Sequence, residues 1–228
     1  MNHTAAIFKK QLKDTCKNKT ILIQFVMFPV LTLVMHNMIK IDGMPKNFFV
    51  NLFAVMYMGM APLTSISAVI AEEKEKNTLR VLLMSNVKPC EYLLGIGSHI
   101  WTACMLGAAV ICTVGNYRLQ ERIIFMILMA AGIFISLLLG AAIGIWSKNQ
   151  MMASSIAIPV MMVLSFLPML SMFHDTVRKV GRFIYSEQIN RMISQIDSLQ
   201  IEKESICILG GNLVIFVVLF LTAYRKWD

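Results

Sequence analysis

Few residues in this chain could do chemistry, and their spacing fits none of the common catalytic or metal sites. The five cysteines show no C-x-x-C spacing and three fall within apolar runs, so we interpret them as packing residues. His99 is the only ionisable group deep in an apolar run, where it could relay protons or bond to a neighbouring helix as a neutral imidazole. No G-x-x-x-x-G-K-S/T sequence occurs, so the chain cannot cradle ATP phosphates itself. We therefore expect no catalytic residue and no metal or cofactor bound by this chain.

Glu72 and Glu73 are the one adjacent pair of carboxylates that an enzyme could use. Glutamate-type intramembrane proteases carry such a pair, followed by an arginine at a short fixed spacing and by histidines deep in later spans. Here Asn77 stands where that arginine is expected, and His174 lies at the outer edge of its run. The pattern therefore argues against a protease.

The elements that must position these residues are strongly apolar. The chain is 57% apolar and 15% charged, whereas soluble domains average about 45–50% and about 25%. Runs of 18 or more apolar residues predict transmembrane helices. Six such runs occur, at residues 21–38, 48–70, 92–114, 123–146, 151–172 and 205–224. We expect an all-α integral membrane protein in which residues 1–228 form a single domain.

None of the six runs contains Asp, Glu, Lys or Arg. An ion-coupled transporter or pump normally keeps such charges on its pathway. Their absence points to an external source of energy for any transport.

The positive charges indicate how the chain is oriented. The formal net charge is +8, but the basic residues lie outside the apolar runs and no piece is long enough for a soluble nucleic-acid-binding domain. Basic loops stay in the cytoplasm. Five lysines precede the first run, at positions 9, 10, 13, 17 and 19, whereas only Lys40 and Lys46 follow it. We therefore expect a multi-pass protein of the cell membrane with both termini in the cytoplasm.

Two segments outside the runs have amphipathic helical patterns. Residues 5–19 predict a helix lying on the inner leaflet with its lysines toward acidic headgroups; its apolar face would hold Ile7, Phe8, Leu12, Thr15 and Cys16. Between the fifth and sixth runs, apolar residues recur at intervals of three and four; they are Tyr185, Ile189, Met192, Ile196 and Leu199. We expect this second helix to rest on, or dip into, the outer leaflet.

The fourth run contains small residues four positions apart, which form one smooth stripe along a helix: Gly132, Ser136, Gly140 and Gly144. Small residues at this spacing let helix backbones approach closely. The stripe could pack within the subunit or form a dimer seam. Prolines at positions 62, 159 and 168 interrupt the second and fifth runs as hinges or kinks.

Residues 71–91 form the third segment outside the runs. A charged stretch is followed by an apolar cluster, a turn at Ser85 and Asn86, and a helix restart near Pro89. Such a compact group of apolar side chains on a short helix, which we call the apolar knob, either lies on the membrane or fills a groove in a partner. The knob comprises Leu79, Val81, Leu82, Leu83 and Met84.

This segment resembles the type-2 permease family of ATP-binding-cassette transporters, as does the layout of all six spans. The residues that carry the resemblance are Glu72, Glu73, Thr78, Leu79, Leu82, Leu83, Val87, Glu91, Leu94 and Gly95. Asn77 stands where the family often has Gly, and Ile96 where it often has Lys. The resemblance implies a membrane-surface helix before the first span and short external helices after the fifth.

The resemblance also implies a function and partners. The loop between spans two and three would be a coupling helix that docks on an ATPase, through Glu72, Glu73, Thr78, Leu79, Leu82, Leu83 and Met84. Two separate ATPase subunits would bind ATP and Mg²⁺, and a second permease, identical or different, would complete the transporter. Members of this size resemble exporters of peptides, drugs or other amphipathic compounds. The alternative is a membrane module without an ATPase, such as a ligand-capturing or regulatory subunit.

The predicted orientation can be tested by labelling single cysteines with an impermeant thiol reagent in a background free of other cysteines. A cysteine at Ser194 should react in intact cells, whereas one at Asn77 should react only after the membrane is opened. The reverse pattern would show that the topology is inverted.

Overall fold

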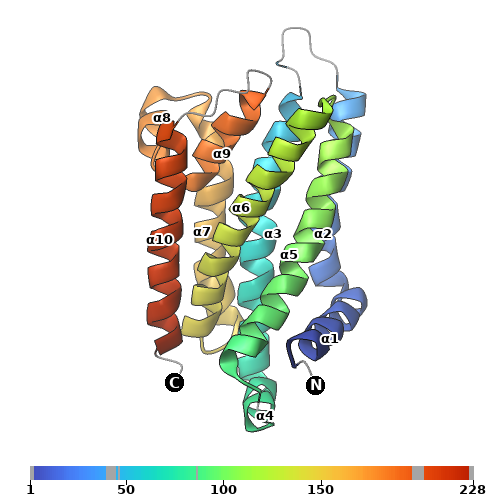
Figure 1. The fold of residues 1–228 in the computed structure, drawn as a ribbon, viewed down its shortest axis with the longest axis vertical. Coiled ribbons are helices and arrows are strands. Elements are labelled where there is room, and N and C mark those ends of the chain that lie inside the picture. Colours follow the sequence, from blue (N-terminus) through green and yellow to red (C-terminus); the bar gives the residue numbers. More distant parts are fainter. Residues whose placement is uncertain (1–2, 40–44, 46, 86, 197–202, 226–228) are drawn as a thin grey trace.

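The computed structural model describes residues 3–39, 45, 47–85, 87–196 and 203–225, and 89% of these described residues are helical. Six long helices run side by side and four short ones lie near the ends of the bundle (Figure 1). The long helices are α2 (Lys19–Met38), α3 (Phe48–Glu75), α5 (Pro89–Val114), α6 (Leu119–Trp146), α7 (Gln150–Ser171) and α10 (Lys203–Arg225). The short helices are α1 (His3–Lys17), α4 (Thr78–Met84), α8 (Asp175–Gly181) and α9 (Tyr185–Ser194).

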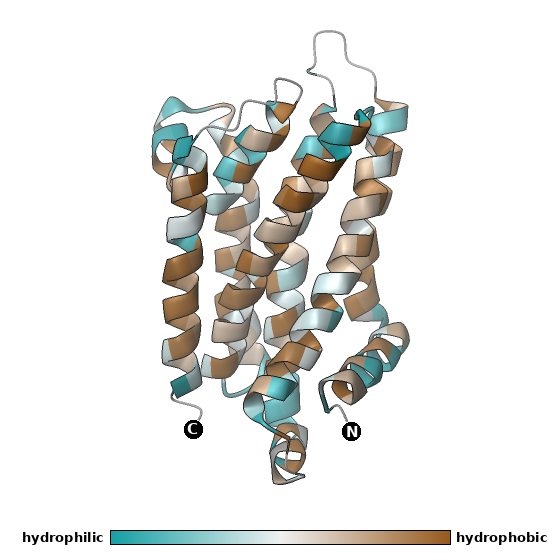
Figure 2. Ribbon diagram, in the orientation of Figure 1, coloured by the Kyte–Doolittle hydropathy of each residue, from teal (hydrophilic) through white to brown (hydrophobic). Residues whose placement is uncertain are grey.

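The six expected spans are confirmed, because each long helix is long and apolar enough to cross a membrane. Hydrophobic residues cover the middle of these helices and hydrophilic residues gather at the two ends of the bundle (Figure 2). We call these ends the α4 end, where α1 and α4 lie, and the α9 end. With 28 residues each, α3 and α6 are about 42 Å long, which exceeds the hydrocarbon thickness of about 30 Å.

Helices α5 and α6 begin three and four residues before the apolar runs, and acidic residues cap their first turns. The backbone N–H of Lys88 donates to Glu91 Oε2 at 3.0 Å, and that of Arg118 donates to Glu121 Oε2 at 2.7 Å. Carboxylates are stabilising at helix N-termini because they accept from unpaired N–H groups and complement the helix dipole. The charged first turns of α5 and α6 are therefore helical although they are too polar to count as apolar runs.

The central helix is α3, which contacts α2, α5, α6, α7 and α9. The stripe of small residues on α6 lies against it. A Cβ at Gly140 would come within 2.5 Å of the carbonyl oxygen of Leu63, and one at Gly144 within 3.1 Å of Ser67 Cα. Ser136 Oγ donates to the carbonyl oxygen of Met58 at 2.7 Å. The stripe therefore packs inside the subunit, where the two backbones approach closely.

The structure corrects the expected position of α9. Its apolar residues Tyr185 and Ile189 have no exposed surface, and the helix contacts α3, α6, α7 and α10. The Tyr185 and Ser136 hydroxyls share a hydrogen bond of 2.6 Å. The apolar face is therefore buried in the protein instead of in the outer leaflet, because it packs against these four helices. Leu199, which we expected on the same face, lies outside the described residues.

The α3–α6 contact predicts a large difference between two glycine substitutions. Gly140→Ala should destabilise the purified protein by about 1–3 kcal/mol, because the added methyl group meets Leu63 backbone that cannot move freely. Gly210→Ala on α10 is the control, since a Cβ there meets nothing within 4 Å. Thermal unfolding in detergent should show a lower Tm for Gly140→Ala only. Equal Tm values would contradict the close approach.

Candidate functional site

The segment between the second and third spans folds as a helix end, a tight turn and a short helix. Helix α3 continues to Glu75, and Asn77 adopts φ 56° in the turn before α4. A positive φ favours Gly, and Asn tolerates it better than most residues, so Asn77 suits this turn. Thr78 Oγ1 donates to the carbonyl oxygen of Glu73 at 3.1 Å. This bond ties the first turn of α4 to the end of α3.

The charged residues at the end of α3 bind several different elements. Lys74 Nζ donates to the carbonyl oxygens of Ile145 and Ser147, at 2.5 and 2.7 Å, at the C-terminal end of α6. Glu75 Oε2 accepts from the backbone N–H of Gln150, at 2.9 Å, at the first residue of α7. A cation at a helix C-terminus and an anion at an N-terminus both complement the helix dipole. These two residues therefore hold the α6–α7 connection against α3.

Glu73 faces in a third direction, toward α1. It is 8% exposed, and its Oε1 accepts from Lys10 Nζ at 2.7 Å and from Gln11 Nε2 at 2.9 Å. Glu72 makes a local ion pair of 2.5 Å with Lys76. The hydrogen bond to Glu72 raises the pKa of the Lys76 ammonium above its usual value. We call residues 72–76 the α3 junction, because they connect α1, α4, α6 and α7 to α3.

The apolar knob is divided between two environments. Leu79 is 4% exposed and Leu82 packs partly against the core, so these residues fix α4 to the bundle. Val81 and Met84 are 62% and 80% exposed. The side chain of Leu83 lies outside the described part of the structure. The sequence grouped Leu82 with Met84 in one apolar knob, but the helix turns Leu82 partly inward and leaves Val81 and Met84 exposed.

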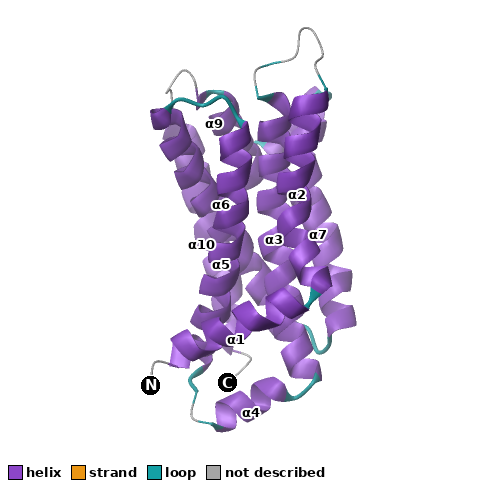
Figure 3. Ribbon diagram, turned by 90° about the vertical axis from the view of Figure 1, so that its right-hand side faces the viewer, coloured by secondary structure: helices purple, strands orange, loops and turns teal. Residues whose placement is uncertain are grey.

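Helix α1 lies across the long helices at the α4 end (Figure 3) and packs chiefly on α5. A Cβ at Gly95 would come within 2.7 Å of Ile7 Cγ2, so Gly95 allows the two helices to touch. Thr15 Oγ1 and His99 Nε2 share a hydrogen bond of 2.9 Å. The expectation that the apolar face of α1 lies on the inner leaflet is therefore partly wrong, because Ile7 and Thr15 on this face contact protein. Leu12 is 49% exposed, and Cys16 beside it on the helix is exposed as well.

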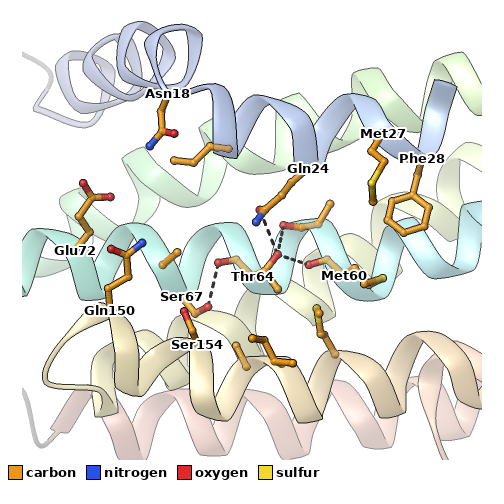
Figure 4. A pocket seen from close by; sticks show the side chains of 16 residues that line it. Asn18, Gln24, Met27, Phe28, Met60, Thr64, Ser67, Glu72, Gln150 and Ser154 are labelled. Atoms are coloured by element: carbon orange, nitrogen blue, oxygen red, sulfur yellow. Dashed lines mark hydrogen bonds between the residues drawn. The ribbon is translucent and has the colours of Figure 1, made fainter. Parts of the chain in front are cut away.

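An open groove lies between α2 and α7, with α3 as its floor (Figure 4). Its volume is about 480 Å³, and it runs from Glu72 at the α4 end to Met60 and Met161. Its walls combine apolar side chains with uncharged polar ones; the polar ones are Asn18, Gln24, Thr64, Ser67, Gln150 and Ser154. Gln24 Oε1 accepts from Thr64 Oγ1 at 3.3 Å and from Ser65 Oγ at 3.0 Å.

Sequence reasoning missed this groove. Its polar residues are single hydroxyls and amides on three different helices and, at Asn18, on the connection between α1 and α2, so no local motif joins them. A usable signal was present in α3, where Thr64, Ser67 and Ala68 are small residues at helical spacing.

These features define a class of protein: a multi-pass membrane protein that exposes a short anchored helix at one end of its bundle. A family model described as ABC-2 family transporter protein matches residues 4–223. The chain therefore belongs to this family, and it is the membrane permease component of an ABC transporter, which implies ABC ATPase partners. A comparison with curated proteins gave no significant match.

The contacts of the α3 junction predict that Lys74 stabilises the end of α6. Lys74→Met should cost on the order of 1–2 kcal/mol, because two carbonyl groups lose a charged donor. Hydrogen exchange should accelerate in the last turn of α6. Lys148→Met is the control, because Lys148 is exposed and the substitution removes the same charge from the same connection. Similar exchange in the two variants would contradict the assignment.

Proposed function

We propose that this chain is the transmembrane half of an ATP-driven exporter, with α4 as the element on which a separate ATPase docks. The observation that carries the proposal is the combination of an exposed tip and an anchored base. Val81 and Met84 are exposed on α4, whereas Leu79 and the α3 junction fix its base to several helices of the bundle. A force applied to α4 would therefore reach the spans.

The energy for transport would come from outside the chain. The described long helices carry no charged group in their middle parts, and the sequence contains no phosphate-binding loop. We propose two ATPase subunits, which would bind ATP and Mg²⁺, and a second permease that would complete the membrane part. Both termini and α4 would lie in the cytoplasm.

The groove between α2 and α7 supports an amphipathic cargo. Met27, Phe28 and Met161 offer apolar surface, whereas Gln24 and Thr64 offer hydrogen-bonding groups. Among the described residues that line the groove, Glu72 at one end is the one charged group, so the groove suits a compound with apolar bulk and a few polar groups. Peptides and drugs of that character are the cargo we propose, exported from the cytoplasmic side.

The docking role of α4 predicts different results for two substitutions. Met84→Asp should fold and insert normally, because the side chain is 80% exposed. The variant should no longer bind its ATPase, because an unpaired carboxylate buried in a partner's groove costs several kcal/mol of binding free energy. Each 1.4 kcal/mol corresponds to about tenfold in affinity. Co-purification of the ATPase measures the effect.

Leu79→Asp is the contrasting variant, because it buries a carboxylate inside the subunit and should lower the yield of folded protein. If Met84→Asp inserts normally and keeps its ATPase, the tip of α4 lies on lipid or in water, and the proposed docking role is wrong.

A further inference from the structure

Three of the contacts between α1 and the rest of the described chain bear on how this helix is attached. Two of them, Ile7 on Gly95 and Thr15 on His99, are made to α5. The third is made by Lys10 and Gln11 to Glu73 on α3. Only this third contact reaches the base of α4, because the carbonyl oxygen of Glu73 accepts from Thr78.

The Glu73 contact differs from the other two because it depends on charge. The carboxylate is almost fully buried, so it requires donors in place of the water it has lost. Lys10 and Gln11 supply these donors from α1, and Tyr92 on α5 lies beside the carboxylate. Hydrogen bonds to an ionised group in a low-dielectric site are stronger than neutral ones.

The lysine side of this contact is accessible. The Lys10 side chain is 42% exposed, and it lies at the edge of an exposed surface of α1 that carries Lys9, Lys13 and Lys17. Water can therefore replace the Lys10 ammonium at the carboxylate without disturbing the apolar contacts of α1. The contact can break while α1 stays folded on α5.

We propose that Glu73 is a positioning residue that makes the membrane-surface helix α1 and the helix α4 move as one unit, through its bonds to Lys10 and Gln11. The proposal rests on the function proposed above, in which α4 receives the movement of an ATPase. The backbone of Glu73 holds α4 and its side chain holds α1, so one residue joins the two helices that lie outside the spans at this end. When the contact is absent, α1 remains on α5 while α4 follows α3.

The test is a distance measurement between α1 and α4. Spin labels are placed on cysteines at Lys13 and Ser85, both exposed, in a chain whose exposed cysteines, Cys16, Cys90 and Cys207, are replaced by serine. The protein is studied in lipid nanodiscs with its co-purified ATPase, without nucleotide and after trapping with ATP, Mg²⁺ and vanadate. The parent chain should give one narrow distance distribution in each state.

Lys10→Met and Glu73→Gln should each broaden the distribution and add a second population. The ratio of the population that keeps the parental distance between α1 and α4 to the second population should fall about tenfold, as expected for the loss of one charge-assisted hydrogen bond between α1 and Glu73. Lys10→Arg should restore the narrow distribution, because it keeps the charge and the donor. Lys9→Met is the matched control and should behave like the parent, since it removes a neighbouring charge and leaves Glu73 untouched.

Distributions of parental width in both Lys10→Met and Glu73→Gln would overturn the proposal. Lys10→Met keeps the test valid if Glu73→Gln fails to fold, because Lys10 is partly exposed. If no ATPase co-purifies with the parent chain, the proposed function fails. The nucleotide-free distances of the isolated chain would still show whether Glu73 joins α1 to α4.

Discussion

The α3 and α6 backbones approach each other along the stripe of small residues, and the other helices are arranged around this pair. In a bilayer, helices gain little from hiding apolar surface from each other, so packing and hydrogen bonds must hold them together. Gly140 and Gly144 remove the side chains that would separate the two backbones. Ser136 adds a hydrogen bond to the carbonyl oxygen of Met58. This contact makes α3 a central helix that most other elements can touch.

The central position of α3 explains why its charged end has so many partners. A charged stretch at the end of a peripheral helix would be solvated, and its ion pairs would contribute little. At the end of α3, Glu73, Lys74 and Glu75 lie within reach of α1, α6 and α7. Each side chain meets a group of complementary charge or dipole. The end of α3 beside α4 is therefore bonded to helices that are far apart in the sequence but lie in one bundle (Figures 1 and 3).

The groove shows how the spans can be uncharged and still polar. Thr64 Oγ1 donates to the carbonyl oxygen of Met60 at 2.7 Å, and Ser67 Oγ to that of Thr64 at 3.1 Å. Hydroxyls that donate to a carbonyl of their own helix have a small free-energy cost in lipid. Their oxygen atoms keep lone pairs that can still accept a hydrogen bond. Such a wall can tolerate both acyl chains and an amphipathic solute, which a buried carboxylate would not.

Much of the architecture follows from the sequence because the bilayer imposes strict rules. Six apolar runs predict six helices, since an unpaired backbone cannot cross lipid, and the break near Pro89 predicts the separate α4. Sequence also indicates that α1 and α9 are amphipathic, but it does not say what covers their apolar faces. Tertiary packing decides that α9 enters the bundle. It also decides that Glu73 turns toward Lys10, and that Leu82 turns partly inward while Met84 remains exposed. The physical reason is that the length of an apolar segment, which decides whether it can cross the bilayer, depends on composition alone. The rotation of each helix about its own axis, which decides what each side chain touches, depends on the shapes of the neighbouring helices.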